Sequence, residues 1–347
     1  MSAAISDESV VGDERVLIVI VNYRTASLAV ACLQSLAVEL ASHPHARVVV
    51  VDNDSGDGSM AQLRAAIDGA GWGSWVELVA SAVNGGFAAG NNLGIRTALR
   101  RGLRPSHVWL VNPDAEVRPG ALDVLLQFMA QHPRAGIAGG CLESPSGEVW
   151  PYAFRFPSIW SEIDSGLRLG VVSRMVARHA ALRRMGEAPE PVDWICGANF
   201  MIRGQLLDRI GLMDEDYFLY FEEVDYCLQA RRAGWQCWFV PAARVMHIAG
   251  QSSGISSADL APPRRPAYWF ESRRRYFVKN HGRVYAWLTD LAWLGSFSSW
   301  RLRRRLQGKT DVDPPQMLAD FARHSLLVQP FVQVRDAAAV RATDSFQ

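Results

Sequence analysis

The first third of the chain alternates apolar runs with segments of helical periodicity. Four apolar runs predict strands, at residues 16–21, 48–51, 75–80 and 107–111. Helical patterns follow the first three runs: one from about residue 27, one from Ser59 as the expected capping residue, and one over residues 92–101. The run at 16–21 has no polar residue, which is typical of a strand buried on both faces. The alternation predicts a doubly wound, Rossmann-like α/β domain with a mostly parallel sheet.

Polar residues stand where these strands end. Right-handed crossovers place the carboxyl ends of parallel strands along one edge of the sheet, which is where such sheets bind ligands. The side chains that we expect together at this edge are Asn22, Tyr23, Asp52, Asn53, Asn84 and Asp114.

The second half of the chain is less regular. Its expected elements are a helix near 120–132, a strand near Ile137, a helical segment over 163–185 that ends before 189–191, a strand over 192–202, and strands over 236–240 and 245–247. Gly197 interrupts the 192–202 strand and marks a close approach of backbone. Residues 250–263 are rich in Ser, Gly and Pro and predict a flexible loop.

The most unusual stretch is residues 214–225, which holds six carboxylates and four aromatic rings in twelve residues. A helix is predicted from Glu223 up to Gly234, so Glu222, Glu223 and Asp225 fall at a helix start, where free N–H groups favour negative charge. These acids can be solvated caps. The neighbouring rings favour a second interpretation, because a partly desolvated carboxylate is suited to proton transfer.

Three further motifs suggest ligand binding, and each has a plain structural alternative. The glycines of residues 85–90 let backbone approach a ligand, but they match neither a dinucleotide fingerprint nor a P-loop and can form a simple tight turn. Asp114 in Asn112-Pro113-Asp114 can hold a divalent cation on a diphosphate, or can close an Asx-turn. His247 ends an apolar strand beside the expected loop, where it is either a metal or phosphate contact or a structural histidine.

Composition limits the protein class. With 49% hydrophobic and 20% charged residues the chain is globular. The five cysteines are scattered, without a C-x-x-C pair, which favours reduced thiols in the cytoplasm. Residues 1–14 are polar and acidic, so we expect a disordered tail and no signal peptide. No uncharged apolar stretch reaches the roughly 18 residues of a membrane span.

Charge is unevenly distributed along the chain. Residues 1–263 carry a net −7, residues 264–309 a net +10, and the remainder a net −2. The basic segment also holds aromatic residues, and we expect it to lie as an amphipathic helix on an anionic membrane surface. The alternative is a helix packed on the rest of the protein with a solvated basic face. Nucleic-acid binding gains no support from the strand-end residues.

The order of motifs resembles a known family. Residues 19–23, 51–55, 84–94, 110–114, 197–198 and 221–227 together are similar to the family 2 inverting glycosyltransferases, in particular their bacterial rhamnosyltransferase-like branch. The resemblance covers roughly residues 15–255. It implies a glycosyltransferase A-type fold over 15–250, with a nucleotide-binding half (15–118) and an acceptor half (119–250). A flexible loop (251–266) and a helical C-terminal extension (267–347) would follow.

The same resemblance implies a function and a site. The expected reaction moves a sugar, L-rhamnose from dTDP-rhamnose before others, to a hydroxyl of a glycan or polyprenyl-linked acceptor in cell-surface polysaccharide synthesis. It would use Mg²⁺ or Mn²⁺. The expected site residues are Glu223 as general base, Glu222, Asp225, Trp194 and Gly197 for the acceptor, Asp114 and His247 for the metal, and Asn22, Tyr23, Asp52, Asn53, Asn84, Gly86, Asn91 and Asn112 for the donor nucleotide.

Two departures from the family pattern keep alternatives open. Asn112 stands where the first acid of the D-x-D motif is expected, so metal affinity would rest on Asp114, His247 and the diphosphate. The base position holds Glu, so Glu222 remains an alternative to Glu223. A sugar-phosphate nucleotidyltransferase and a non-catalytic nucleotide-sugar-binding protein are the competing functions. We expect a cytoplasmic protein, peripheral at the inner face of the cell membrane, and a homodimer.

Overall fold

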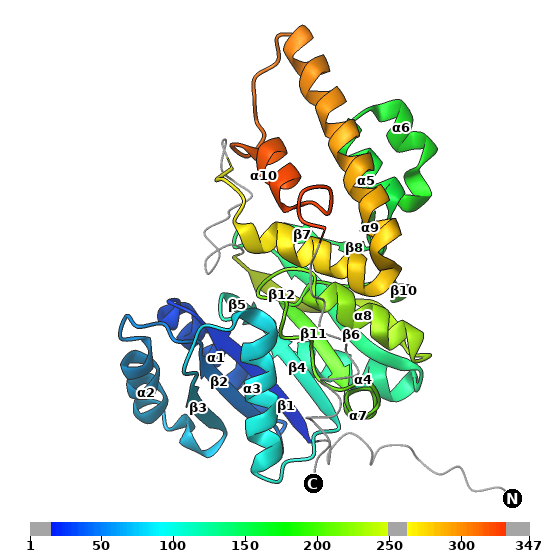
Figure 1. Ribbon diagram of the computed structural model, residues 1–347. Helices are drawn as coiled ribbons and strands as arrows, with labels where there is room; N and C mark the ends of the chain where they lie inside the picture. Colours follow the sequence, from blue (N-terminus) through cyan, green and yellow to red (C-terminus); the bar gives the residue numbers. More distant parts are fainter. Residues whose placement is uncertain (1–14, 249–261, 331–347) are drawn as a thin grey trace, which may run out of the picture.

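A ten-stranded mixed sheet runs through the centre of the molecule (Figure 1). The computed structural model describes residues 15–248 and 262–330. The main strand order is β10-β12-β6-β11-β4-β1-β2-β3, with β5 paired to β12 and β7 to β6. The bounds are β1 Val16–Asn22, β2 Arg47–Asp52, β3 Val76–Ala80, β4 His107–Val111, β5 Ala115–Val117, β6 Ala135–Glu143, β7 Val149–Trp150, β10 Glu190–Val192, β11 Asn199–Arg203 and β12 Gln236–His247.

The predicted parallel arrangement is confirmed for β1 to β4. In that half β4, β1, β2 and β3 are parallel neighbours, and Asn22 of β1 lies beside Asp52 of β2 at the carboxyl edge. Strand β11 is antiparallel to both β4 and β6, whereas β12 is parallel to β6. A separate small sheet pairs β8 (Tyr152–Phe154) with β9 (Leu182–Arg184).

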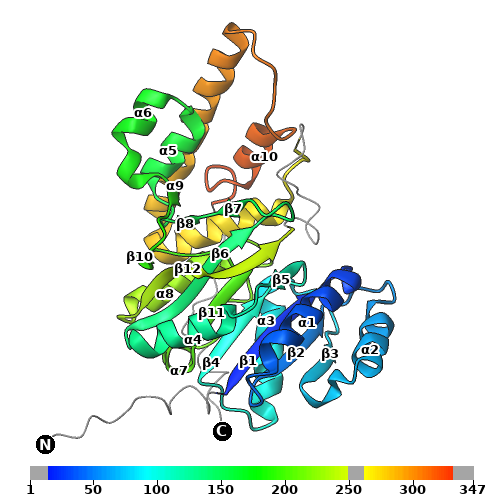
Figure 2. The same ribbon diagram turned by 180° about the vertical axis from the view of Figure 1, so that it is seen from behind.

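Helices cover both faces of the sheet because each central strand is apolar on both faces. Val16, Ile18 and Ile20 pack in one core, under α1 (Ala26–Leu40), α2 (Ser59–Gly69) and α4 (Ala121–Gln131). The alternate residues Leu17 and Val19 pack in a second core, under α3 (Gly86–Arg100), α7 (Gly204–Ile210) and α8 (Glu222–Arg232). Figures 1 and 2 show these two layers from opposite sides. Two short 3-10 helices, Trp72–Ser74 and Ala177–His179, lie in connecting segments.

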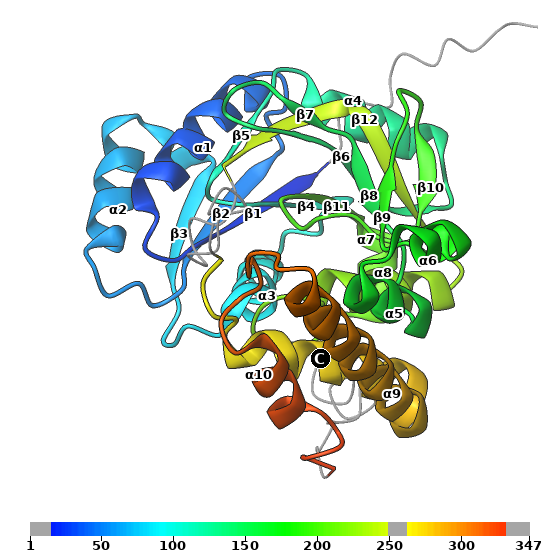
Figure 3. The same cartoon turned by 90° about the horizontal axis from the view of Figure 1, so that it is seen from above.

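The C-terminal extension is helical, as predicted, and consists of α9 (Ala267–Leu306) and α10 (Met317–His324). Gly282 has φ 83° and bends α9 into two halves. The first half packs beside α8, and the second half projects away from the sheet together with α5 (Ile159–Leu167) and α6 (Gly170–Met175) (Figure 1). Seen from above, α9 and α10 lie on the side of the sheet that carries α3 and α8 (Figure 3). Within the described residues, no helix is both long and apolar enough to span a bilayer.

Two predicted elements of the second half are wrong. Residues 163–185 do not form one helix, because α5 ends at Leu167 and the next residue, Arg168, is left-handed, with φ 50°, before α6 and β9. Residues 192–202 do not form one strand either. The carboxylate of Asp193 accepts the N–H of Phe156 (2.9 Å), and the chain turns there from the edge strand β10 to the central strand β11.

Other boundaries also differ. The helix expected at residue 92 begins at Gly86, so the glycine-rich segment forms its first turns. Ser59 is not the cap of α2. Gly58 holds that position, and the Asp57 carboxylate accepts the Ser59 N–H at 3.0 Å. The two strands expected over 236–247 are one continuous strand, β12. The expected tail (1–14), most of the 250–263 loop and the end of the extension (331–347) lie outside the described residues.

Candidate active site

The carboxyl ends of β1 and β2 carry a buried polar network. The Asn22 amide donates to Asp52 Oδ1 (2.7 Å), and the Ser55 hydroxyl donates to the same oxygen (2.6 Å). Asn22 Oδ1 in turn accepts the Thr25 N–H (3.2 Å). Because the strand register places Asn22 directly beside Asp52, these side chains are held in fixed positions before any ligand binds. Tyr23 is half-buried next to them.

Asn53 links this network to the start of α3. Its Nδ2 donates to Asn84 Oδ1 (2.9 Å) and to the carbonyl of Gly86 (3.0 Å). Its Oδ1 is buried and has no partner among the described residues. A buried acceptor without a donor is unfavourable, so this oxygen is available to a ligand N–H or O–H. Asn91 is buried one turn further along and donates to the Phe87 carbonyl (2.9 Å).

We expected the glycine at position 86 to allow a close approach to a ligand, but a contact within this chain requires it. It has φ +83°, and a Cβ added there would lie 1.7 Å from the carbonyl oxygen of Phe218. The N–H of Phe87 donates to that same oxygen (2.9 Å). The close contact is therefore between two backbones of this chain, and it ties the start of α3 to the acidic stretch 214–225.

Asn112, Asp114 and His247 come together beyond β4 and the end of β12. His247 Nε2 lies 3.2 Å from Asp114 Oδ1 and 3.1 Å from Asn112 Nδ2. Strand β12 pairs with β5, and His247 lies opposite Ala115. This pairing brings together residues that are distant in the sequence. The Asp114 side chain is 5% exposed and that of His247 is 10% exposed.

The residue types at this position fit a divalent cation. A carboxylate oxygen beside an imidazole nitrogen is a donor set that Mg²⁺ or Mn²⁺ accepts. Among residues 15–248 and 262–330, no three His, Cys, Asp or Glu side chains gather as a metal site. Asp114 and His247 would therefore supply only part of the coordination, and a diphosphate and water would supply the rest.

Glu222 and Glu223 begin α8 immediately after a strained turn. Tyr220 and Phe221 both have left-handed φ angles, 71° and 69°, which are unfavourable for aromatic residues and occur together at functional sites. Burial raises the pKa of Glu223 to about 7, although N–H groups of Glu223 itself and of Gly197 act in the opposite direction. Burial, and then the charge of Glu223, raise the pKa of Glu222 well above its usual value. A pKa of about 7 suits Glu223 to accept a proton near neutral pH.

Cys196 carries a thiol whose pKa responds to carboxylates of both groups. Burial, the largest cause, and then the negative charges of Glu223, Asp114 and Glu222 raise the pKa of its thiol to about 12. The Asp114 and Glu223 carboxylates thus both act on the Cys196 thiol. The sequence drew no attention to Cys196, although it directly precedes Gly197, whose N–H acts on Glu223.

Two residues expected to contact the acceptor have other partners. Asp225 is 3% exposed, and its carboxylate accepts from Lys279 Nζ (2.6 Å) and Asn280 Nδ2 (2.6 Å) of α9. Trp194 stacks on Phe154 with 4.1 Å between ring centroids, and its Nε1 donates to the Arg155 carbonyl (3.0 Å). These contacts argue for structural roles. Asp214 is half-buried and forms ion pairs with Arg275 and Lys279.

Comparison with protein families agrees with this geometry. The family model described as "Glycosyltransferase like family 2" matches residues 14–269. The chain belongs to this family. The predicted resemblance is therefore confirmed at the level of the family, over the region that contains the strand-end network, Asp114, His247 and Glu223.

Curated relatives share part of this region. An N-acetylglucosaminyl-diphospho-decaprenol L-rhamnosyltransferase of Mycobacterium tuberculosis is 33% identical over 174 residues, which cover 48% of this chain and 55% of that protein. A low-salt glycan biosynthesis hexosyltransferase, Agl10 of Haloferax volcanii, is 28% identical over 189 residues, 54% of each chain. The chain thus spans about half the length of these relatives.

Solved structures confirm the fold. GalNAc-T7, solved with UDP, GalNAc and Mn²⁺, superposes with a TM-score of 0.55 at 14% identity, covering 91% of this chain and 57% of that one. The glycosyltransferase A-type fold that we predicted is therefore confirmed.

Proposed function

We propose that this protein transfers a sugar from a nucleotide-sugar donor to an acceptor hydroxyl with inversion at the sugar carbon. The observation that carries the proposal is the buried Glu223 carboxylate at the start of α8, whose Oε2 has no partner among the described residues, together with the Asp114–His247 contact at the strand ends. An inverting transfer needs one carboxylate base on the acceptor side and charge stabilisation on the diphosphate side. The site provides these two groups, and it provides one base rather than the spaced carboxylate pair of a glycosidase.

In the proposed step, Glu223 accepts the proton of the acceptor hydroxyl. The hydroxyl oxygen forms a bond to the anomeric carbon as the bond from that carbon to the diphosphate oxygen breaks. The raised pKa of Glu223, about 7, matches a base that works near neutral pH. The unpartnered Oε2 atom of Glu223 is available for the hydroxyl proton.

On the donor side, Asn22, Asp52 and Asn53 would orient the nucleotide, and the free Oδ1 of Asn53 would accept one of its hydrogen bonds. Asp114 and His247 would hold the metal ion, with Asn112 beside them. A divalent cation bound there would neutralise the charge that develops on the departing diphosphate. The GalNAc-T7 structure, which was solved with Mn²⁺ and UDP, supports this part of the proposal.

The sugar and the acceptor are proposed from the relatives. Rhamnosyltransferases recur among the curated relatives, and one is named as a dTDP-rhamnosyl transferase. We therefore propose L-rhamnose from dTDP-rhamnose as the donor and a lipid-linked glycan of the cell surface as the acceptor. The homodimer expected from the sequence stays a prediction.

A calorimetric screen of nucleotide sugars tests the donor. We expect dTDP-rhamnose to bind at least about tenfold more tightly with Mn²⁺ than without it, because a cation held by Asp114 would offset the negative charge of the diphosphate. UDP- and GDP-sugars serve as comparisons. Binding of another donor would overturn the rhamnose assignment alone. If the protein binds a donor but shows neither sugar transfer nor slow donor hydrolysis, the result would favour a non-catalytic binding protein. Turnover of a sugar phosphate with a nucleoside triphosphate would favour the nucleotidyltransferase.

We also propose that the second half of α9 contacts an anionic membrane. We expected the membrane-binding surface over residues 264–309. The first half of α9 is not available for it, because Arg273, Arg275 and Lys279 pair with acidic residues of this chain. Beyond the bend, Val284, Trp287, Leu288 and Leu291 are 76%, 43%, 41% and 40% exposed. Together they form an apolar surface, and the exposed Arg283 lies beside it. Such a surface suits the boundary between headgroups and acyl chains.

Flotation with anionic liposomes tests this surface. We expect the double variant Trp287→Asp, Leu291→Asp to lose most of the liposome-bound fraction, because two carboxylates would have to enter the interface. Val38→Asp is the matched control, since Val38 is a 63% exposed apolar residue on α1. Equal flotation of the double variant and the wild type would contradict the proposal. Truncation before α9 is unsuitable as a test, because it would also remove the partners of Asp214 and Asp225.

A further inference from the structure

One face of α9 follows the acidic stretch 214–225 along its length. Six residues of α9 contact that stretch, and their spacing of three to four places them on one side of the helix: Tyr268, Ser272, Arg275, Tyr276, Lys279 and Asn280. The family match ends at residue 269, just inside α9, so almost all of this face lies beyond the matched region.

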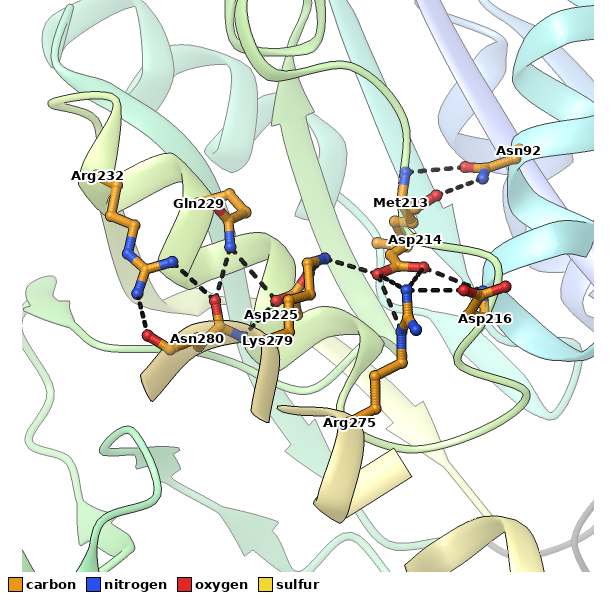
Figure 4. Close-up of polar contacts among 10 residues, drawn as sticks. All are labelled: Asn92, Met213, Asp214, Asp216, Asp225, Gln229, Arg232, Arg275, Lys279 and Asn280. Carbon is orange, nitrogen blue, oxygen red and sulfur yellow. Dashed lines mark hydrogen bonds and ion pairs between the residues drawn. The ribbon is translucent and has the colours of Figure 1, made fainter. Parts of the chain in front are cut away.

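Lys279 is at the centre of the contact. Its Nζ lies 2.6 Å from Asp214 Oδ2 and 2.6 Å from Asp225 Oδ2, and its side chain is 10% exposed. Asp214 begins the acidic stretch, and Asp225 lies in α8 two residues after Glu223. Figure 4 shows the lysine between the two carboxylates. One half-buried ammonium group therefore joins the two ends of the loop that precedes Glu223.

Neighbouring side chains complete this network. Arg275 binds Asp214 (2.8 Å) and Asp216 (2.8 Å). Asn280 donates to Asp225 (2.6 Å) and accepts from Arg232 Nη1 (2.8 Å). Lys279 and Arg275 also hold the pKa of Asp214 below its usual value, in spite of burial, which would raise it. Asp214 is thus held as a carboxylate and is matched by cations, as a charge withdrawn from water requires.

The loop between these two anchored ends contains the strained turn. The Ser272 hydroxyl donates to the Leu219 carbonyl (3.0 Å), and the Tyr276 ring lies 5.6 Å from that of Phe221. Tyr220 and Phe221 keep their left-handed conformations only because the surroundings hold them. Relaxation of this turn would change the direction of the first turn of α8, and with it the position of the Glu223 carboxylate.

We propose that Lys279 is a positioning residue for sugar transfer: by joining Asp214 to Asp225 it holds the turn at Tyr220 and Phe221 and so sets the position of Glu223. The first half of α9 is then a required part of the catalytic unit. This inference rests on the proposed function for its catalytic consequence. Its structural consequence, an ordered 217–224 segment, is independent of that function.

The test compares Lys279→Met, Lys279→Arg and a matched control, Arg304→Met, in the full chain. Arg304 is also a cation of α9, has a 9% exposed side chain and pairs with two aspartates, Asp311 and Asp313, but far from the acidic stretch. Kinetics would use dTDP-rhamnose, Mn²⁺ and a short-chain alkyl N-acetylglucosaminyl diphosphate. Hydrogen exchange of residues 217–224 would be measured without any ligand.

For Lys279→Met we expect kcat to fall by about 10- to 100-fold, with the KM for the donor within about twofold of wild type, because the base is misplaced while the donor edge is unchanged. Lys279→Arg should restore most of kcat. Exchange in 217–224 should accelerate in Lys279→Met only, whereas Arg304→Met should lower the melting temperature without changing kcat. Unchanged exchange in 217–224, or an equal loss of kcat in Arg304→Met, would overturn the inference. Faster exchange in a protein that transfers no sugar would instead count against the proposed function.

Discussion

Replacement of Glu223 by Gln is expected to lower kcat for sugar transfer by about 10³-fold. The amide cannot accept the acceptor proton, while the donor edge and the Asp114–His247 pair stay intact. The KM for the donor should therefore change little. Steady-state kinetics with the donor found in the calorimetric screen measures both constants.

The pH profile of the wild type gives a second check on Glu223. Because burial raises its pKa to about 7, the carboxyl is protonated and inactive below that pH. We expect kcat/KM to fall about tenfold for each pH unit below 7. A profile that stays flat down to pH 5 would show that a group of lower pKa acts as the base.

The Glu223→Gln variant should have a larger free energy of unfolding than the wild type above neutral pH. The folded-state pKa of Glu223 lies above the unfolded value, so its contribution to stability is fully present below about pH 4.5 and is lost as the pH rises through about 7. At pH 8 the buried charge costs on the order of 3 kcal/mol, which Gln avoids. Melting temperatures of Glu223→Gln and wild type should thus be equal near pH 4.5 and differ by several degrees at pH 8.

Glu222→Gln is the matched control for these experiments. Glu222 is 3% exposed, and burial and then the charge of Glu223 raise its pKa well above the usual value, which favours the neutral form that the amide replacement resembles. We expect kcat within about threefold of wild type. A large loss in Glu222→Gln together with near-normal turnover in Glu223→Gln would reverse the assignment of the base.

Asp114→Asn is expected to lower kcat/KM by about 10²- to 10³-fold and to remove the effect of Mn²⁺ on donor binding. Asp114 is the carboxylate of the proposed metal position, and Asn112 and His247 offer no second negative charge. His247→Ala should cost less, about 10- to 100-fold, because one neutral ligand is lost while the anionic one remains. Calorimetry of dTDP binding with and without Mn²⁺ measures the metal dependence directly.

Asp123→Asn provides the comparison for Asp114→Asn, because Asp123 is a 58% exposed aspartate that pairs with His43 away from the site. Its activity and metal response should match wild type. Treatment of the wild type with a chelator should reproduce the loss in Asp114→Asn, and added Mn²⁺ should restore the wild type alone. Full activity in excess chelator would contradict metal use.

The sequence by itself determined the α/β fold of residues 15–248 to a large extent. The apolar runs at 16–21, 48–51 and 107–111 are long and free of charge, so their burial as strands follows from local pattern. Strand-end polarity then placed Asn22, Asp52 and Asp114 on one edge, because parallel crossovers allow no other arrangement. Membership of the glycosyltransferase family was also evident, since the order of several short motifs is more specific than any one of them.

Only the tertiary structure decided which of the acidic residues are available for chemistry. Pattern shows that Asp214, Asp225 and Lys279 lie on helices or turns, but not that one ammonium group neutralises both carboxylates. The same holds for Gly86, whose close neighbour is the Phe218 carbonyl more than a hundred residues away. Such contacts join segments that are far apart in the sequence, and the hydrophobic and polar pattern of one segment does not predict which other segment it contacts. For that reason the basic segment, which by sequence was expected on a lipid surface, proved in its first half to bind the chain's own acidic stretch.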